Sequence, residues 1–266
     1  MLTADTALRA VAAGLAAVLT VAALEYALLL RAGALGPGGL FDWDILRLRR
    51  TVIRYPAARP LDRMFASPNA TGTWLATAPL GGIGAAVFWN TPAGAAAALL
   101  SALFLLLAAA RFPFGRDGAD QVALFWSLAV LGYQLHPTPA AATVFGYLIC
   151  AQLTGGYAVA GWSKLSARDW TRGSAMAMVL HSSCYGNPPL AQHVPLRAAY
   201  LAGLAVAIWE ATFPAVWLLP EPAALTFLAV GVAFHLGCWL VMGLNTFLLT
   251  FAAGYPALVW LVSGRA

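Results

Sequence analysis

The chain has 266 residues, of which 61% are hydrophobic and only 9% are charged. Soluble domains carry about 25% charged residues, so this composition, with a mean hydropathy of +0.77, excludes a soluble globular protein. We therefore predict an all-α integral membrane protein that crosses the lipid bilayer several times.

Basic residues outnumber acidic ones by 15 to 10, which gives a net charge of +5. Fourteen of the fifteen are arginines, and Lys164 is the only lysine. We interpret the arginines as anchors to anionic headgroups and expect no nucleic-acid partner, because no soluble aromatic platform accompanies them. The three cysteines form no CxxC pair, so neither a disulfide framework nor a metal site is expected.

Apolar segments recur along the chain and predict a single domain over residues 1–266, a bundle of about eight transmembrane helices. The first contains Glu25, which can reach the interface, pair with an arginine or form part of a site. The second is the weakest, because it contains Pro79 and three glycines. The predicted spans are 7–30, 71–89, 93–110, 121–135, 140–162, 196–219, 223–242 and 246–262.

Two connecting segments are too polar or too short to cross the bilayer. Residues 31–67 interleave arginines with aromatic and aliphatic residues, which predicts amphipathic helices in the headgroup region. Their function is either lipid anchoring or, over residues 41–65, docking of a protein partner. Residues 166–195 contain a short apolar stretch ended by Gly186-Asn187-Pro188-Pro189, which predicts an interfacial or re-entrant segment.

The basic residues cluster in alternate connections. With eight spans, the connections 31–63, 111–116 and 164–197 fall on one side and contain 13 of the 15 basic residues. The turns predicted on the opposite side contain no Lys or Arg. The positive-inside rule then predicts cytoplasmic basic connections and external termini.

Three ionisable side chains in or beside the predicted spans are candidates for chemistry. Lys164 ends an apolar run; if desolvated it can act as a general base or amine nucleophile, and otherwise it snorkels to the headgroups. Glu210 lies halfway along its span, so it is either protonated or paired with a cation such as Lys164, an arginine or His235. His235 is equally central, either as a hydrogen-bonded core residue or as part of a shared polar cavity.

The histidines show no metal-binding spacing such as HxxxH or HExxH. We therefore predict no metal site. A haem would need axial ligands on facing helices, for which His136 and His235 are the candidates.

One stretch carries a family resemblance. The pattern Tyr157-xxx-Gly161-xx-Lys164-Leu165-xxxx-Trp170-xx-Gly173 resembles the membrane domain of vitamin K-dependent γ-glutamyl carboxylases, a domain shared with bacterial horizontally transferred transmembrane (HTTM) proteins. Two further pieces are similar and follow in the same order, Glu210-xxx-Pro214 and Phe234-His235 with Met242-Gly243-xxx-Phe247. The resemblance covers roughly residues 7–260.

The resemblance implies a catalytic role for Lys164, because the matching carboxylase lysine is the base that starts oxygenation of vitamin K hydroquinone. It implies a quinone or hydroquinone as cofactor, lyase- or oxidoreductase-like chemistry, and Glu210 and His235 lining the cavity. The candidate cofactor-binding residues are Tyr157, Trp162, Trp170 and His136.

The chain also departs from the carboxylases. They continue into a soluble region that binds the substrate propeptide, whereas this sequence ends at Ala266, so we do not expect an animal-type protein carboxylase. Shorter bacterial relatives include a membrane protein that matures a secreted peptide toxin with a soluble partner, which implies a bacterial inner-membrane location and a secreted peptide substrate. The carboxylase site is external, whereas the charge distribution places Lys164 inside, so the orientation stays open.

Three functions follow from these features. The first is a membrane enzyme or maturation factor with Lys164 as the base. The second is a non-catalytic subunit or scaffold of a larger membrane complex, and the third is a small transporter. The first is favoured because the single lysine stands among arginines, and a titratable amine could not be replaced by a guanidinium group.

Overall fold

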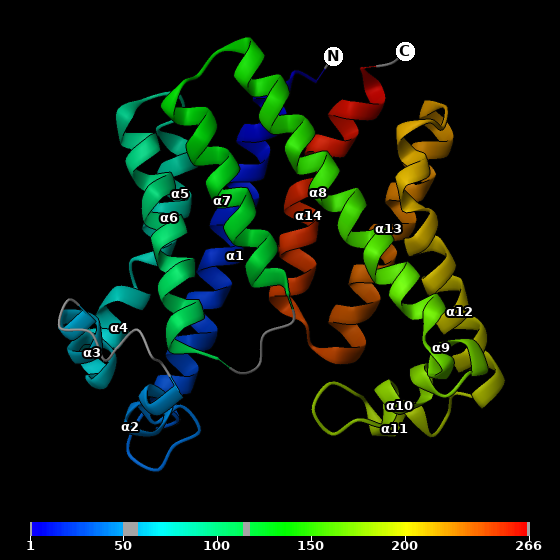
Figure 1. The fold of residues 1–266 in the computed structure, drawn as a ribbon, viewed down its shortest axis with the longest axis horizontal. Coiled ribbons are helices and arrows are strands. Elements are labelled where there is room, and N and C mark those ends of the chain that lie inside the picture. The colour runs from blue at the N-terminus through cyan, green and yellow to red at the C-terminus, as the bar shows by residue number, and fades with distance from the viewer. Residues whose placement is uncertain (1, 50–57, 114–117, 265–266) are drawn as a thin grey trace. The chain divides into compact units, whose positions relative to one another are not determined.

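A computed structural model of the chain describes residues 2–49, 58–113 and 118–264. These residues form helices joined by short connections, and no β-strand occurs among them (Figure 1), which confirms the all-α prediction. The chain forms two compact units. The N-terminal unit is Arg9–Thr138, and the C-terminal unit is Pro139–Ala266 with the first residues of the chain.

Six helices in the described ranges are long and apolar enough to cross a membrane. They indicate a multi-pass membrane protein surrounded by a lipid bilayer. They are Ala4–Arg31, Pro92–Arg111, Pro139–Ser166, Leu196–Trp217, Glu221–Met242 and Asn245–Ser263. Each corresponds to one of the eight predicted spans, and the other two predicted spans take different forms.

The N-terminal unit contains α6, most of the long helix α1 (from Arg9 on) and several shorter helices. Its elements are α1 (Ala4–Arg31), α2 (Trp43–Leu46), η1 (Arg47–Arg49), α3 (Arg59–Ala66), α4 (Pro68–Leu75), α5 (Ala78–Val87), α6 (Pro92–Arg111) and α7 (Ala119–Leu135).

The predicted span 71–89 is divided between α4 and α5. The break falls at Ala76 and Thr77, just before Pro79, whose ring and missing N–H group favour a first-turn position over a helix interior. The predicted span 121–135 corresponds to α7, whose 17 residues extend about 25 Å against a hydrocarbon core of about 30 Å. The count of eight spans therefore stays a prediction.

The predicted amphipathic segment 31–67 contains short helices, and its residues 50–57 lie outside the described ranges. The Trp43 indole N–H donates to Asp62 at 2.8 Å, and Arg47 forms an ion pair with the same carboxylate at 3.6 Å. The guanidinium of Arg111, at the end of α6, lies 5.3 Å from the Trp43 ring. Trp43 of this connection thus packs against the basic end of α6, while a position of the segment in the headgroup region stays a prediction.

The C-terminal unit carries the candidate residues Lys164, Glu210 and His235. Its elements are α8 (Pro139–Ser166), α9 (Arg168–Arg172), α10 (Ala175–His181), α11 (Pro188–Ala191), α12 (Leu196–Thr212), η4 (Phe213–Trp217), α13 (Glu221–Met242) and α14 (Asn245–Ser263). Within this unit α9, α10 and α11 gather where α8 ends and α12 begins (Figure 1).

Helix α8 packs directly on α12 and α14. A side chain at Gly146 would overlap the Trp260 ring of α14, and one at Gly161 would overlap the backbone of Glu210 and Ala211 in α12. The α8 backbone therefore approaches both neighbours closely through glycines, a packing mode common between membrane helices.

We expect Gly161→Ala to destabilise the protein, because the added methyl group must push α8 away from α12. Overpacking of this kind costs about 1–3 kcal/mol. The matched control is Gly155→Ala in the same helix, where the added group meets nothing within 4 Å and helix propensity favours alanine. Thermal unfolding in detergent should show a lower midpoint for Gly161→Ala alone, and equal midpoints for the two variants would contradict the close approach.

Candidate functional site

Lys164 lies in the last turn of α8, which extends two residues beyond it to Ser166. A cation is favoured at this position because the carbonyl ends of a helix carry partial negative charge. The ammonium group donates a hydrogen bond to Glu210 Oε2 of α12 and forms an ion pair with it. Of the two alternatives for Glu210, protonation or pairing with a cation, the structure shows the pairing, and the cation is Lys164.

Both partners are largely withdrawn from the surface. The Lys164 side chain is 21% exposed and that of Glu210 is 4% exposed. An isolated charge is costly in a medium of low dielectric constant, so each group offsets the desolvation cost of the other by balancing its charge. Lys164 is therefore not a free headgroup anchor.

The Gly161-xx-Lys164 spacing explains how the pair forms. Gly161 faces the backbone of Glu210 and Ala211, so α8 and α12 are closest at this level. Lys164 follows Gly161 by three residues and so lies on the same face of α8, one turn further on. The close approach thus places the amine beside the carboxylate.

The indole ring of Trp170, in α9, lies beside the Lys164 amine. The Lys164 Nζ atom lies 5.4 Å from the centre of its ring, within the range of a cation–π interaction. The motif residues Lys164 and Trp170, six positions apart in the sequence, are therefore brought together.

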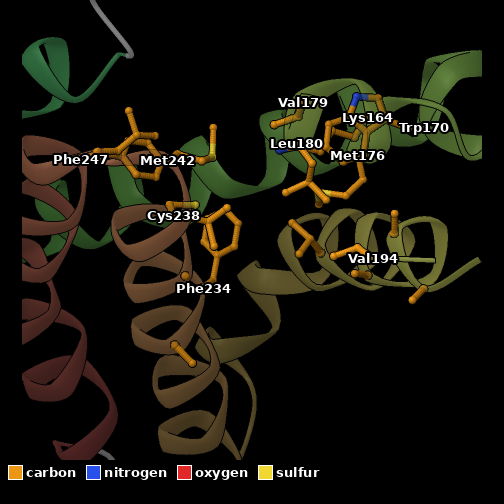
Figure 2. Close-up of a pocket in the computed structure, with 18 residues that line it drawn as sticks. Lys164, Trp170, Met176, Val179, Leu180, Val194, Phe234, Cys238, Met242 and Phe247 are labelled. Carbon is orange, nitrogen blue, oxygen red and sulfur yellow. The ribbon is translucent and has the colours of Figure 1, made fainter. Parts of the chain in front are cut away.

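Lys164 and Trp170 both line a cavity of about 640 Å³ (Figure 2), within the usual range of small-molecule sites. Of the described residues that line it, Lys164 alone is charged. The remaining wall is largely aliphatic and aromatic, with contributions from α10, α12, α13 and α14, and includes Phe234, Phe247 and the thiol of Cys238. The cavity is thus an apolar chamber with one ionic group.

His235 belongs to a separate polar cluster. Its side chain is 1% exposed, and Nε2 lies 2.5 Å from the Tyr157 hydroxyl. The same hydroxyl lies 2.8 Å from that of Tyr255, so Tyr157 joins α8 to both α13 and α14. The imidazole also stacks on Phe251. Its Nδ1 atom has no hydrogen-bond partner within the described ranges.

The candidate residues therefore divide into groups. Of Lys164, Glu210 and His235, only Lys164 lines the cavity; Glu210 is its ion-pair partner and His235 binds Tyr157. The expectation that all three line one cavity is corrected accordingly, because the Glu210 and His235 side chains contact Lys164 and Tyr157 of α8 and do not line the cavity.

Three of the four candidate cofactor-binding residues do not line the cavity, and the first of them, Tyr157, belongs to the polar cluster with His235. Trp162 is 62% exposed on α8, and His136 is exposed where α7 ends in the N-terminal unit. Neither lines the cavity, whereas Trp170 does.

Sequence reasoning did not identify Tyr255 or the cavity wall contributed by α10. The one signal for Tyr255 in the sequence is a tyrosine hydroxyl next to Pro256 within an otherwise apolar segment. The cavity-lining residues of α10 are Met176, Val179 and Leu180, at spacings of three and one. That spacing indicates an apolar helix face but does not show what the face covers.

Comparison of the chain with protein-family models, with curated proteins and with solved structures gave no match. The class of protein is defined by its own features, a multi-pass α-helical membrane protein with an ion pair beside an apolar cavity.

Removing one partner of the ion pair should cost more stability than removing both. Lys164→Met leaves the Glu210 carboxylate buried without its cation, which we expect to lower the free energy of unfolding by up to about 3 kcal/mol. In Lys164→Met with Glu210→Gln no charge remains, and most of the loss should be recovered. Unfolding titrations in mixed micelles measure both variants, and a double variant no more stable than the single one would argue against the pair.

Tyr157→Phe should destabilise the protein by about 1–3 kcal/mol, because it leaves buried polar atoms of His235 and Tyr255 without their shared partner. Tyr147→Phe, on the exposed part of the same helix, is the control and should change little. The same unfolding titration compares them. A double variant Tyr157→Phe with Tyr255→Phe should show non-additive losses, and strict additivity would show that the two hydroxyls do not interact.

Proposed function

We propose that this protein is a membrane enzyme or maturation factor in which the Lys164–Glu210 pair accepts a proton from a hydroquinone-like substrate bound in the cavity. One observation carries the proposal: among the described residues that line the apolar cavity, the one charged group is an amine whose charge is balanced by a buried carboxylate. Paired ionisable groups beside a cavity are candidates for sites of proton transfer.

The pair is suited to the task because amine and carboxylate share one proton and carry no net charge. The ammonium group can pass its proton to Glu210 Oε2, and the free amine at Nζ can then accept a proton from a substrate in the cavity, so that the pair ends as an ammonium group beside a protonated carboxyl. The substrate O–H bond then breaks, its electron pair remains on the substrate oxygen, and the proton moves to the pair. The resulting positive charge stabilises the negative charge that develops on the substrate.

The cavity residues fit a hydroquinone. Trp170, Phe234 and Phe247 offer aromatic faces for a flat ring, and the apolar wall suits an isoprenoid tail. When bound, a hydroquinone would supply an acidic hydroxyl and two-electron redox chemistry. Lys164 and Trp170 would hold its head, and the side chains of α10 would keep water from it.

The family and cellular location belong to the same proposal. The Lys164 motif supports membership of the HTTM family, and with it a bacterial inner-membrane location and a secreted peptide as the final substrate. Within the C-terminal unit the pair lies at the basic end, next to Arg168 and Arg172 of α9. The positive-inside rule applied to that end would place it in the cytoplasm.

A second function, as a scaffold in a larger membrane complex, is supported by the segment 41–65. Ile45 and Leu48 are exposed there next to Arg47, and such apolar groups beside basic ones suit either lipid or a protein partner. A scaffold would depend on this surface and not on Lys164, so the experiment below separates the two functions.

Lys164→Arg should retain the ion pair and the fold but lose the proton transfer, because a guanidinium group does not release its proton. The assay uses the protein in lipid nanodiscs with a short-tailed naphthohydroquinone, kept reduced without oxygen at neutral pH, and follows the absorbance of its deprotonated form. We expect a loss of at least 100-fold in rate, as for removal of a general base.

Ser163→Ala, adjacent and exposed, should behave as the unchanged protein in that assay. Equal rates for Lys164→Arg and the unchanged protein would contradict the proposed role of Lys164, while leaving the scaffold function possible.

A further inference from the structure

We infer that the cavity fills sideways from the bilayer, through an opening between α12 and α13, and that it admits amphiphiles with an uncharged polar head and an apolar tail. This inference rests on the proposed function only in placing the ligand head at Lys164. It names the entry route and the ligand class of the same site.

The opening follows from the course of the two helices. They are joined through η4 and diverge from it toward the end at which α9 to α11 lie (Figure 1). Each turns one face to the cavity: Ala198, Ala202 and Val206 of α12 recur every four residues, and Phe234 and Cys238 of α13 have the same spacing. The cavity occupies the space between these faces (Figure 2).

The edge of the opening is apolar and lined by small side chains. Ala198 and Ala202 on α12 and Ala233 on α13 line the cavity and are also exposed, so they mark its edge. The most hydrophobic stretch of α13 has a mean hydropathy of 2.0, and only 17% of that stretch is buried within the protein. A helix surface of this kind faces acyl chains, so the opening lies within the bilayer.

The end of the cavity near the α8 terminus is covered. Met176, Val179 and Leu180 of α10 point into the cavity from this side (Figure 2). Both ends of α10 are closely packed: Gly173 before it lies against the Tyr200 ring of α12, and Gly186 after it lies against carbonyl groups of residues 179–182. Water-soluble ligands therefore meet an apolar cover, whereas lipid-soluble ones meet an open side.

The ion pair determines which head is admitted. Lys164 and Glu210 together carry no net charge, so an anionic or cationic head would bring one uncompensated charge into an apolar chamber. An uncharged hydroxyl or carbonyl adds no charge. Its oxygen can accept a hydrogen bond from the ammonium group, which has three N–H donors and gives one to Glu210.

Photolabelling tests the ligand class. The full-length protein in nanodiscs is irradiated with a long-chain alkanol carrying a diazirine in its tail, or with the carboxylic acid of equal length at alkaline pH. We expect the alkanol to label α10, α12 and α13 around the cavity at least tenfold more than the ionised acid. Equal labelling by both probes would overturn the proposed head selectivity.

Gly237→Phe tests the cavity itself. Gly237 lines the cavity, and an added side chain there meets nothing within 4 Å, so phenylalanine should fill the chamber without disturbing the fold. Gly155→Phe is the matched control, since its added group also meets open space but away from the cavity. Labelling should fall at least tenfold in Gly237→Phe only, and labelling that persists there would show that the probe binds elsewhere.

The entry route is tested with tryptophan on α12. Ala202→Trp narrows the opening, whereas Ala205→Trp changes an exposed residue of the same helix that does not line the cavity. We expect Ala202→Trp alone to slow the appearance of label at least fivefold after the alkanol is added in donor vesicles. Unchanged kinetics in Ala202→Trp would reject the route between α12 and α13.

Lys164→Met separates this inference from the proposed function. It should abolish proton transfer while cavity labelling by the alkanol falls less than tenfold, because the tail contacts remain. If Gly237→Phe loses labelling but Lys164→Arg keeps full proton transfer, the ligand site in the cavity is supported. The proposed proton transfer to Lys164 is then rejected.

Discussion

The close approach of α8 and α12 at Gly161 is the constraint on which the candidate site depends. A bulkier residue would separate the two backbones, and the Lys164 amine would no longer reach Glu210. Each charge would then be left in a medium where an unpaired ion costs several kcal/mol. The glycine, the lysine and the carboxylate therefore form one structural unit, although 46 residues separate the two charged partners in the sequence.

The two polar clusters of the C-terminal unit both depend on α8. Tyr157 precedes Lys164 by seven residues, which is about two helical turns, so both project from similar faces of the helix. Tyr157 binds α13 and α14 through His235 and Tyr255, and Lys164 binds α12 through Glu210. In lipid, where apolar contact alone does not distinguish one helix neighbour from another, such polar contacts specify which helices associate. They leave α12 and α13 free to diverge around the cavity.

The sequence predicted the long helices well, because apolar length alone indicates a span. Pro79 also marked the weak point at which the segment 71–89 divides into α4 and α5. That Glu210 would be either protonated or paired with a cation was predictable from the cost of a buried carboxylate. Which of the two holds, and whether the cation is Lys164, an arginine or His235, was not predictable, because it depends on how the helices are rotated against one another. The cavity could not be predicted, because Ala198, Ala202 and Gly237 look like ordinary residues of a transmembrane helix until α12 and α13 are seen to diverge.

The proposed function would account for a lysine at position 164 in a chain whose other basic residues, histidine aside, are all arginine. Arginine could balance Glu210 equally well, and its planar group would form two hydrogen bonds with the carboxylate. Stability alone therefore does not select lysine at position 164. An amine differs in that it can give up its proton to the neighbouring carboxylate and then, as a free base, take another from a substrate, as the proposed function requires. A buried pair that changes its protonation state beside an apolar chamber is suited to chemistry on a lipid-soluble molecule, whereas a structural anchor would gain nothing from the exchange.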